Sequence, residues 1–255
     1  ALDVTIQAQV LKLLKELTRK LDMGLLMITH DLGIVQRMAD KVHVMNEGQV
    51  VEHNETKTLF ANPSHDYTQH LLSAAPKGRP DPVKPIAHEV MKAKDIRVWF
   101  PIKRGVIKHT VGHIKAVDGI SMTLLEGQTI GVVGESGSGK STLGRAILRL
   151  ESSKGDIDFM GHNVQNYGWK AMRPLRREMQ IVFQDPFGSM SPRMSVFQVI
   201  EEGLLVHKLG ETYDARRKLV AEVLEEVELD PSTMDRYPHE FSGGQRQRIC
   251  VARAL

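Results

Sequence analysis

Apolar side chains recur every three or four residues near the start of the chain, which is the spacing of a helix with one buried face. The members of this stripe are Ile6, Val10, Leu13, Leu14 and Leu17. The spacing predicts a helix over residues 5–21, and Gly24 marks its end because glycine is a poor helix former.

Short apolar runs without helical spacing predict strands that are buried on both faces. The three runs are Leu25–Ile28, Gln128–Val133 and Met179–Phe183. Each run is followed by a polar or glycine-rich segment, and predicted helices lie between the runs. This alternation of strand, loop and helix predicts an α/β fold with a parallel sheet.

The remaining elements follow from the same two periodicities and from turn residues. Further strands are predicted at 42–45, 49–52, 95–100 and 114–125, the first two forming a hairpin. Further helices are predicted at 32–39, within 63–75, and at 141–150, 196–207, 215–228 and after Gly243 and Gly244. A Pro-rich stretch, residues 77–92, predicts a stiff linker between residues 1–76 and 93–255.

Composition narrows the function classes without selecting one. The 255 residues carry a net charge of +3 with both signs mixed along the chain, which disfavours a dedicated nucleic-acid protein. Cys250 is the only cysteine, so no disulfide within the chain and no cysteine metal cluster can form. No apolar run approaches the roughly 20 residues of a membrane span, so we expect any membrane role to go through partner proteins.

The segment GESGSGKST is a complete phosphate-binding loop between a predicted strand and a predicted helix. Glycines let backbone N–H groups surround phosphates, and the helix adds its positive N-terminal end. The lysine is expected to reach the β- and γ-phosphates of ATP, and the serine after it to bind Mg²⁺. The loop residues are Gly134, Glu135, Ser136, Gly137, Ser138, Gly139, Lys140, Ser141 and Thr142.

The segment FSGGQRQR resembles the signature motif of ATP-binding cassette ATPases. Its candidate nucleotide-binding residues are Ser242, Gly243, Gly244 and Gln245. The resemblance implies that Ser242 and Gly244 contact the γ-phosphate of a nucleotide held by another cassette. It also implies a phosphate-loop ATPase fold with a mixed sheet, an antiparallel β subdomain and a helical signature subdomain.

Two further positions carry the resemblance in the second part of the chain. Gln184 in IVFQDP is similar to the family's Q-loop glutamine, which contacts Mg²⁺ and senses the membrane partner. Phe100 resembles the aromatic residue that stacks on adenine, and Trp99 is the alternative candidate for that role.

The first part of the chain resembles the other half of a cassette. The motif ALD, which ends at Asp3, is similar to the D-loop, and His30 in MITHDL is similar to the switch histidine that contacts the γ-phosphate. Residues 62–76 resemble the C-terminal extension of oligopeptide and dipeptide importer ATPases. The order of motifs implies the end of one cassette (1–76) joined to the start of a second (93–255), as in fused double-cassette subunits of oligopeptide and microcin C importers.

The resemblance implies an ATPase subunit, peripheral on the cytoplasmic face of the bacterial inner membrane, that energises peptide import. Its expected partners are permease subunits, a periplasmic solute-binding protein and a second cassette, with no nucleic acid. Because both Walker B strands are missing, we expect a fragment that binds nucleotide weakly and hydrolyses little. A soluble double-cassette ATPase acting on ribosomes or DNA, and an inert fragment, are the alternatives.

Two arrangements of the predicted fragment are open. In the first, the run Leu25–Ile28 pairs with Gln128–Val133, so that one cassette of permuted order forms and His30 faces the phosphate loop. In the second, the two parts form separate half-cassettes.

Overall fold

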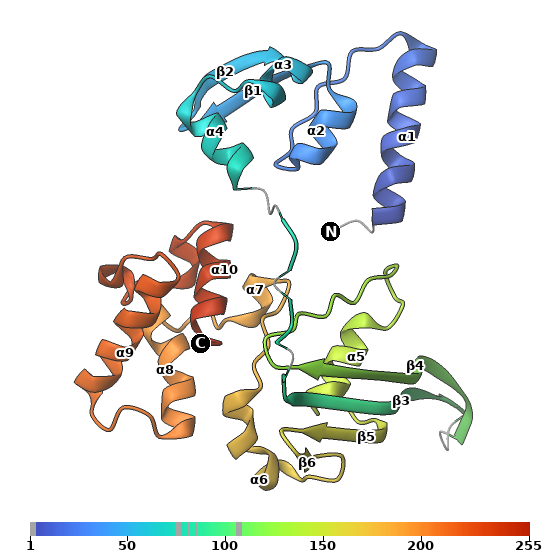
Figure 1. Cartoon of the computed structure of the whole chain (residues 1–255), viewed down its shortest axis with the longest axis vertical. Coiled ribbons are helices and arrows are strands. Elements are labelled where there is room, and N and C mark those ends of the chain that lie inside the picture. The colour runs from blue at the N-terminus through green and yellow to red at the C-terminus, as the bar shows by residue number, and fades with distance from the viewer. Residues whose placement is uncertain (1–3, 75–77, 81, 85, 106–108) are drawn as a thin grey trace. The chain divides into compact units, whose positions relative to one another are not determined.

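The computed structural model describes residues 4–74, 78–80, 82–84, 86–105 and 109–255 (Figure 1). These residues form two compact units. The first unit comprises Ala1–Ile147, Glu151–Gly155 and Phe159–Gly161. The second unit comprises Leu148–Leu150, Asp156–Asp158 and His162–Leu255.

Helices and one hairpin make up the described part of residues 4–74. The helices are α1 (Val4–Leu21), α2 (Leu32–Met38), α3 (Thr56–Ala61) and α4 (Asp66–Ser73). Strands β1 (Lys41–Asn46) and β2 (Gln49–Glu55) pair in antiparallel fashion, which confirms the predicted hairpin. The predicted first helix and the short helix of the importer-like extension are also confirmed.

The carboxylate of Glu52 joins β2 to the start of the extension. Its Oε1 accepts hydrogen bonds of 2.9 Å from both the backbone N–H and the hydroxyl of Ser64. Its Oε2 accepts one of 3.0 Å from the backbone N–H of His65, the residue that caps α4. Glu52 is buried, so these bonds compensate for the removal of its charge from water. The carboxylate therefore fixes where α4 begins.

A four-stranded sheet supports the phosphate loop. Its strand order is β4-β3-β5-β6, with bounds β3 (Glu89–Arg104), β4 (His109–Leu125), β5 (Lys154–Phe159) and β6 (His162–Asn163). β3 and β4 are antiparallel, and helix α5 (Lys140–Ile147) packs against both. Buried side chains from these three elements form the core here, namely Met91, Ala93, Ile96, Val98, Val117, Leu143, Ala146 and Ile147.

Helices with a shared apolar core dominate the second unit. They are α6 (Trp169–Met172), α7 (Pro186–Ser189), α8 (Val196–His207), α9 (Tyr213–Glu226) and α10 (Gly243–Ala252), with 3₁₀ turns at Pro174–Glu178, Pro231–Thr233 and Pro238–Glu240. Helices α8, α9 and α10 contribute the fully buried side chains of Val196, Val220, Leu224, Ile249 and Cys250 to one core. The described helices include none that is both long and apolar enough to cross a bilayer.

Three predicted strands are wrong. Leu25–Ile28, Gln128–Val133 and Met179–Phe183 contain no strand, and the side chains of Ile28 and Val133 are 92% and 91% exposed. A strand buried on both faces needs hydrogen-bonded neighbours and a layer on each side, and these segments have no strand neighbour among the described residues. The parallel sheet that requires them does not form in the described part of the chain.

Candidate nucleotide-binding site

The phosphate loop has the backbone form that its glycines predict. Gly137 and Gly139 have φ values of +79° and +95°, in the left-handed region that side chains other than glycine rarely adopt. At Gly139 a Cβ atom would lie 2.0 Å from the carbonyl oxygen of Ala116, whereas at Gly137 nothing lies within 4 Å. Gly139 is therefore required by close packing as well as by its φ angle.

Lys140 is the first residue of α5, and its ammonium group closes the loop on itself. Its Nζ donates hydrogen bonds to the carbonyl oxygens of Gly134 (2.7 Å) and Glu135 (2.6 Å) and to the hydroxyl of Ser138 (3.3 Å). The three donors of the ammonium group are thus directed at the start and the middle of one short loop. This places a positive charge beside exposed loop residues at the N-terminal end of a helix, an arrangement that suits phosphate.

A bulge in β4 forms the backbone contact on which the phosphate loop packs. Val98 of β3 pairs with Val117, but the next residue, Trp99, pairs with Lys115, so Ala116 is an extra residue on β4. Bulges of this kind redirect the backbone locally. The carbonyl of Ala116 is the group that approaches Gly139.

The two aromatic candidates have different surroundings. The indole N–H of Trp99 donates to Asp118 Oδ1 at 3.0 Å, and the ammonium of Lys115 lies 4.5 Å from the centre of its ring. The same ammonium, together with that indole, lowers the pKa of Asp118. Phe100 lies opposite Ile114 and is 38% exposed. The Trp99 ring is therefore covered by a cation on one face, and the Phe100 ring stays accessible.

The signature segment begins α10 with a reciprocal cap. The hydroxyl of Ser242 accepts a bond of 3.3 Å from the backbone N–H of Gln245, and the Gln245 side chain accepts one of 3.0 Å from the backbone N–H of Ser242. Such a capping box fixes the first turn of a helix. Gly243 and Gly244 have open space where a Cβ atom would be, so another molecule can approach the backbone there closely.

Arg246 ties this helix to the segment that follows Gln184. Its guanidinium donates to the carbonyl oxygens of Pro238 (2.6 Å) and His239 (2.9 Å) and lies 3.9 Å from the centre of the Phe187 ring. Phe187 belongs to α7, whose N-cap Asp185 directly follows Gln184. Gln184 itself is exposed. The Q-loop candidate is thus held next to a short helix that packs on the signature helix.

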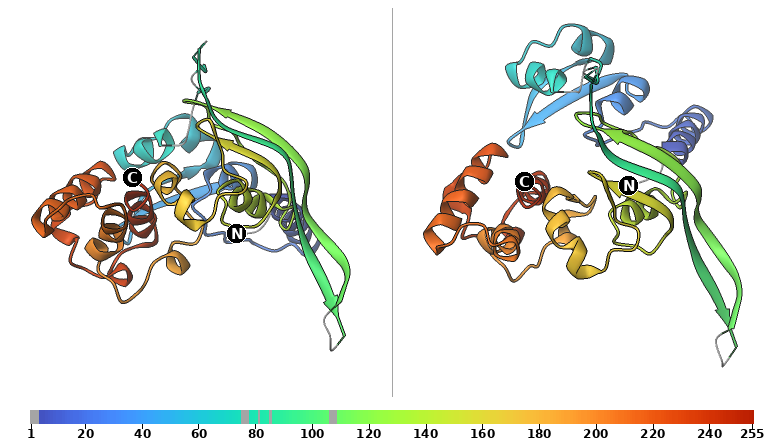
Figure 2. Two further views of the ribbon diagram at one scale, coloured as in Figure 1. Left: turned by 90° about the horizontal axis from the view of Figure 1, so that it is seen from below. Right: turned by 60° about the horizontal axis from the view of Figure 1, so that its bottom comes forward.

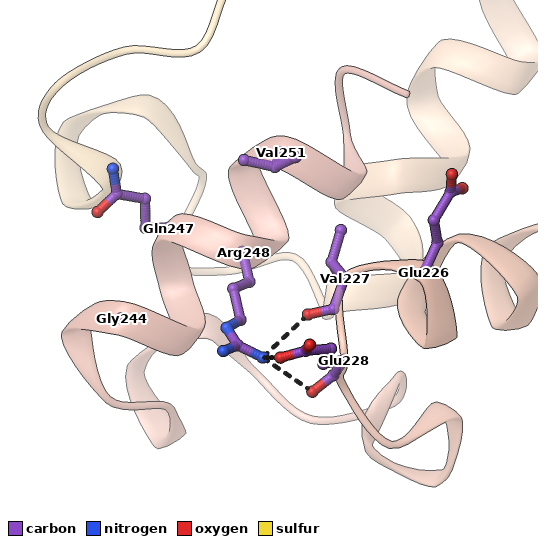
Figure 3. Close-up of a pocket in the computed structure, with 7 residues that line it drawn as sticks. All are labelled: Glu226, Val227, Glu228, Gly244, Gln247, Arg248 and Val251. Atoms are coloured by element: carbon purple, nitrogen blue, oxygen red, sulfur yellow. Dashed lines mark hydrogen bonds and ion pairs between the residues drawn. The ribbon is translucent and has the colours of Figure 1, made fainter. Parts of the chain in front are cut away.

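A hollow of about 420 Å³ lies beside α10 (Figure 3). Its lining residues are Glu226, Val227, Glu228, Gly244, Gln247, Arg248 and Val251. Arg248 points across it to the end of α9 and donates to the carbonyl oxygens of Val227 and Glu228 and to the Glu228 carboxylate, the last at 2.8 Å. These bonds satisfy carbonyls at a helix C-terminus. With two carboxylates in its wall, the hollow is a poor site for phosphate.

The remaining candidates lie in the first part of the chain. His30 is exposed and directly precedes Asp31, which caps α2 by accepting a bond of 3.1 Å from the backbone N–H of Ile34. Asp3 lies outside the described residues. The roles of both residues stay predictions.

Sequence reasoning missed the residues that position the motifs. Ala116 belongs to no motif, and only the cross-strand register reveals it. Arg246 stands inside FSGGQRQR, and the structure is what distinguishes it, because it is buried whereas Arg248 is exposed.

Comparison with known proteins decides the family. The ABC transporter family profile matches residues 117–255, more than half of the chain. The chain belongs to the ABC transporter family.

Curated relatives of this ABC transporter chain resemble it over its whole length. It is 56% identical to the peptidoglycan transport ATP-binding protein YejF of Agrobacterium fabrum, covering 100% of this chain and 47% of that protein. It is 51% identical to an uncharacterized ABC transporter ATP-binding protein, YejF of Escherichia coli, covering 100% and 48%. The glutathione import ATP-binding protein GsiA of Pectobacterium atrosepticum is 43% identical, with 100% and 45% covered. The ABC transporter chain therefore spans about half the length of these relatives.

Solved structures agree with the family. The ATP-binding cassette MJ0796, in a dimeric post-hydrolysis state bound to ADP and phosphate, matches with a TM-score of 0.56 and 26% identity over 65% of this chain and 68% of that one. CbiO1 of Clostridium perfringens matches with a TM-score of 0.52 and 28% identity over 66% and 61%. The predicted phosphate-loop ATPase fold of the family is confirmed.

Proposed function

We propose that this ABC transporter chain binds ATP with Mg²⁺ at its phosphate loop and belongs to a subunit whose ATP hydrolysis energises peptide import across the bacterial inner membrane. The observation that carries the proposal is the loop itself, in which Lys140 is held at the helix N-terminus by three acceptors of the same loop. A capped signature helix on the same chain supports it.

Each loop group has a defined task in nucleotide binding. Lys140 exchanges part of its bonds to the loop carbonyls for bonds to the β- and γ-phosphates, which are stronger because both the ammonium and the phosphate are charged. The backbone N–H groups of the first turn of α5 orient the same phosphates. Phe100 stacks on the base, a role that its accessible ring supports.

Residues on this chain also fit Mg²⁺. The hydroxyl of Ser141 and the side-chain oxygen of Gln184 are hard oxygen ligands, the type that Mg²⁺ takes. When bound, Mg²⁺ neutralises charge on the phosphate oxygens. In this proposal Ser141 binds the ion next to the phosphate loop, and Gln184 is a second candidate ligand through its side-chain oxygen.

The signature helix serves a second cassette in this proposal. Ser242, Gly243 and Gly244 present a hydroxyl and open backbone at the start of α10, which suits the γ-phosphate of a nucleotide on another cassette. Gln245 keeps this turn in shape through its bond to Ser242. Asp3 and His30 supply the D-loop and the switch histidine.

The import role is supported by the relatives and by the extension. Relatives are named for peptidoglycan transport and glutathione import, both of which involve peptide-like compounds. Residues 62–76, anchored by Glu52, resemble the extension of peptide importers. We therefore propose permease subunits and a periplasmic solute-binding protein as partners, and a peripheral location on the cytoplasmic face of the membrane.

The direct test is Lys140→Ala in this 255-residue chain. Because the ammonium is the cation aimed at the phosphates, we expect ATP affinity to fall on the order of a hundredfold or more. Calorimetric titration with Mg-ATP measures this, and Lys218→Ala, which changes a side chain that is 80% exposed, is the matched control. Unchanged affinity in Lys140→Ala contradicts the assignment.

The division of labour between cassettes needs the full-length protein. There, Ser242→Arg should block ATP turnover and leave nucleotide binding at Lys140 intact, because the signature faces the other nucleotide. Loss of binding at Lys140 would show that the two motifs serve the same nucleotide.

A further inference from the structure

The bulge in β4 has a charged side chain on each side of it. β3 and β4 form one long antiparallel pair of strands, as Figures 1 and 2 show, and Ala116 is the extra residue between Lys115 and Val117. Side chains alternate between the two faces of a regular strand, so residues 115 and 118 would project from opposite faces. The extra residue brings Lys115 and Asp118 to the same face, where the ammonium lies 3.2 Å from Asp118 Oδ2. This ion pair therefore depends on the bulge.

Asp118 uses both of its carboxylate oxygens to hold the strands around the bulge. Its Oδ1 accepts a hydrogen bond of 3.0 Å from the indole N–H of Trp99 on β3, and its Oδ2 accepts one of 3.2 Å from the Lys115 ammonium. The same ammonium lies 4.5 Å from the centre of the Trp99 ring. The three side chains thus form a closed set of contacts across the bulge and the neighbouring strand. Removal of the carboxylate releases both of its partners at once.

The bulge is also the part of the sheet that contacts the phosphate loop. A Cβ atom at Gly139 would clash with the carbonyl oxygen of Ala116 and would lie 3.8 Å from Cγ2 of Val117. The carbonyl of Gly139 accepts a hydrogen bond of 2.8 Å from the backbone N–H of Leu143, in the first turn of α5. A shift of the Ala116 peptide therefore displaces the glycine that directly precedes Lys140.

We propose that Asp118 is a positioning residue for nucleotide binding, which keeps the Ala116 carbonyl against Gly139 by holding Lys115 and Trp99 across the bulge. Asp118 acts through the backbone and does not itself contact the nucleotide. A purely electrostatic effect has the opposite sign, because a carboxylate near the loop repels phosphate. The inference deepens the proposed function and rests on it for the identity of the ligand.

A second bulge on the same hairpin offers a matched control. Val90 is an extra residue on β3, because Glu89 and Met91 pair with consecutive residues of β4. Glu89 and Lys92 form an ion pair of 3.4 Å across this bulge, with side chains about half exposed, as in the pair across the β4 bulge. The carbonyl of Val90 accepts a hydrogen bond of 2.9 Å from the backbone N–H of Met160, outside the phosphate loop.

The test compares Asp118→Asn with Glu89→Gln in the 255-residue chain by calorimetric titration with Mg-ATP. Asparagine keeps an acceptor for the indole but loses the ion pair, so we expect ATP affinity to fall about threefold, and Glu89→Gln should leave it unchanged. Asp118→Ala also loses the indole bond and should lower the affinity about tenfold, whereas Asp118→Glu should restore most of it. The ratio between the unchanged chain and Asp118→Asn should shrink in about 0.5 M salt, which screens exposed ion pairs.

Hydrogen exchange without nucleotide tests the route through the bulge. The exchange rate of the Leu143 amide reports on the position of Gly139, because that amide donates to the Gly139 carbonyl. Asp118→Asn should lower the protection of this amide about threefold, and Glu89→Gln should leave it unchanged.

Three results overturn the proposal. They are an unchanged or raised ATP affinity in Asp118→Asn, an equal loss of affinity in Glu89→Gln, and a loss of affinity with no loss of Leu143 protection. If the unchanged chain binds no ATP while Leu143 protection still depends on Asp118, the proposed function fails and the link between the bulge and the loop stands. If the unchanged chain binds ATP and Asp118→Asn binds it equally well, the proposed function stands and this inference fails.

Discussion

The phosphate loop and the signature segment are both phosphate-binding motifs at helix N-termini, but different forces shape them. The loop is largely exposed and takes its form from glycine backbone angles, from Lys140 and from one contact with Ala116. The signature helix takes its position from a buried core through Ile249 and Cys250. The comparison shows that one motif is specified by its own residues and the other by its packing.

The largest expected effect on stability comes from the buried core that positions the signature helix. Ile249 is fully buried in the helical core, so Ile249→Ala should destabilise the chain by about 4 kcal/mol through lost transfer energy and a cavity. Urea denaturation measures this loss, and Val251→Ala on the exposed side of the same helix should change stability by less than about 1 kcal/mol. Equal effects of the two substitutions would remove the distinction between the motifs.

The next effect concerns the loop and uses two glycines as a pair. Gly139→Ala adds a Cβ atom 2.0 Å from the Ala116 carbonyl, in addition to left-handed strain, and should cost about 2–3 kcal/mol and greatly weaken ATP binding. Gly137→Ala has the strain without the clash and should cost about 1 kcal/mol. Thermal unfolding and ATP titration distinguish the two, and the same loss in both would show that backbone strain alone decides.

The smallest effect concerns helix caps. Ser242 caps α10 and Ser195 caps α8 with the same reciprocal bonds to a glutamine, so alanine at either position should cost about 1 kcal/mol. The two variants should differ in function, because in the full-length protein only Ser242→Ala should slow ATP turnover. Turnover slowed equally by Ser195→Ala would indicate that Ser242 acts only as a cap.

Local signals predicted the helices well. The predicted helix 196–207 has the same bounds as α8, because its apolar spacing and its cap at Ser195 are encoded within the segment. The hairpin of β1 and β2 is equally local. The backbone form of the phosphate loop followed from its glycines.

Features that depend on distant partners were not predictable in this way. Gln128–Val133 has the composition of a buried strand, but a strand forms only where neighbours accept its hydrogen bonds, and the composition does not supply them. The bulge at Ala116 depends on the register between β3 and β4. The position of the Arg246 side chain depends on its contact with Phe187, which lies 59 positions earlier in the sequence. The functional roles of the site residues stay predictions.

The hydrogen bonds that Ser64 and His65 donate to the Glu52 carboxylate make the attachment of the importer-like extension dependent on pH. The nearby Thr68 hydroxyl and the hydrogen bonds from the backbone N–H groups of Ser64 and His65 lower the pKa of Glu52 to about 2. Because the folded-state pKa lies below the ordinary value of 4.5, the stabilisation is present above pH 4.5 and is lost as the pH falls towards 2. The protection of the α4 amides against hydrogen exchange, relative to the unfolded chain at the same pH, should fall over that range, and Glu52→Gln should lose this pH dependence. Protonation of a single carboxylate thus sets the lowest pH at which the start of α4 stays bound to β2.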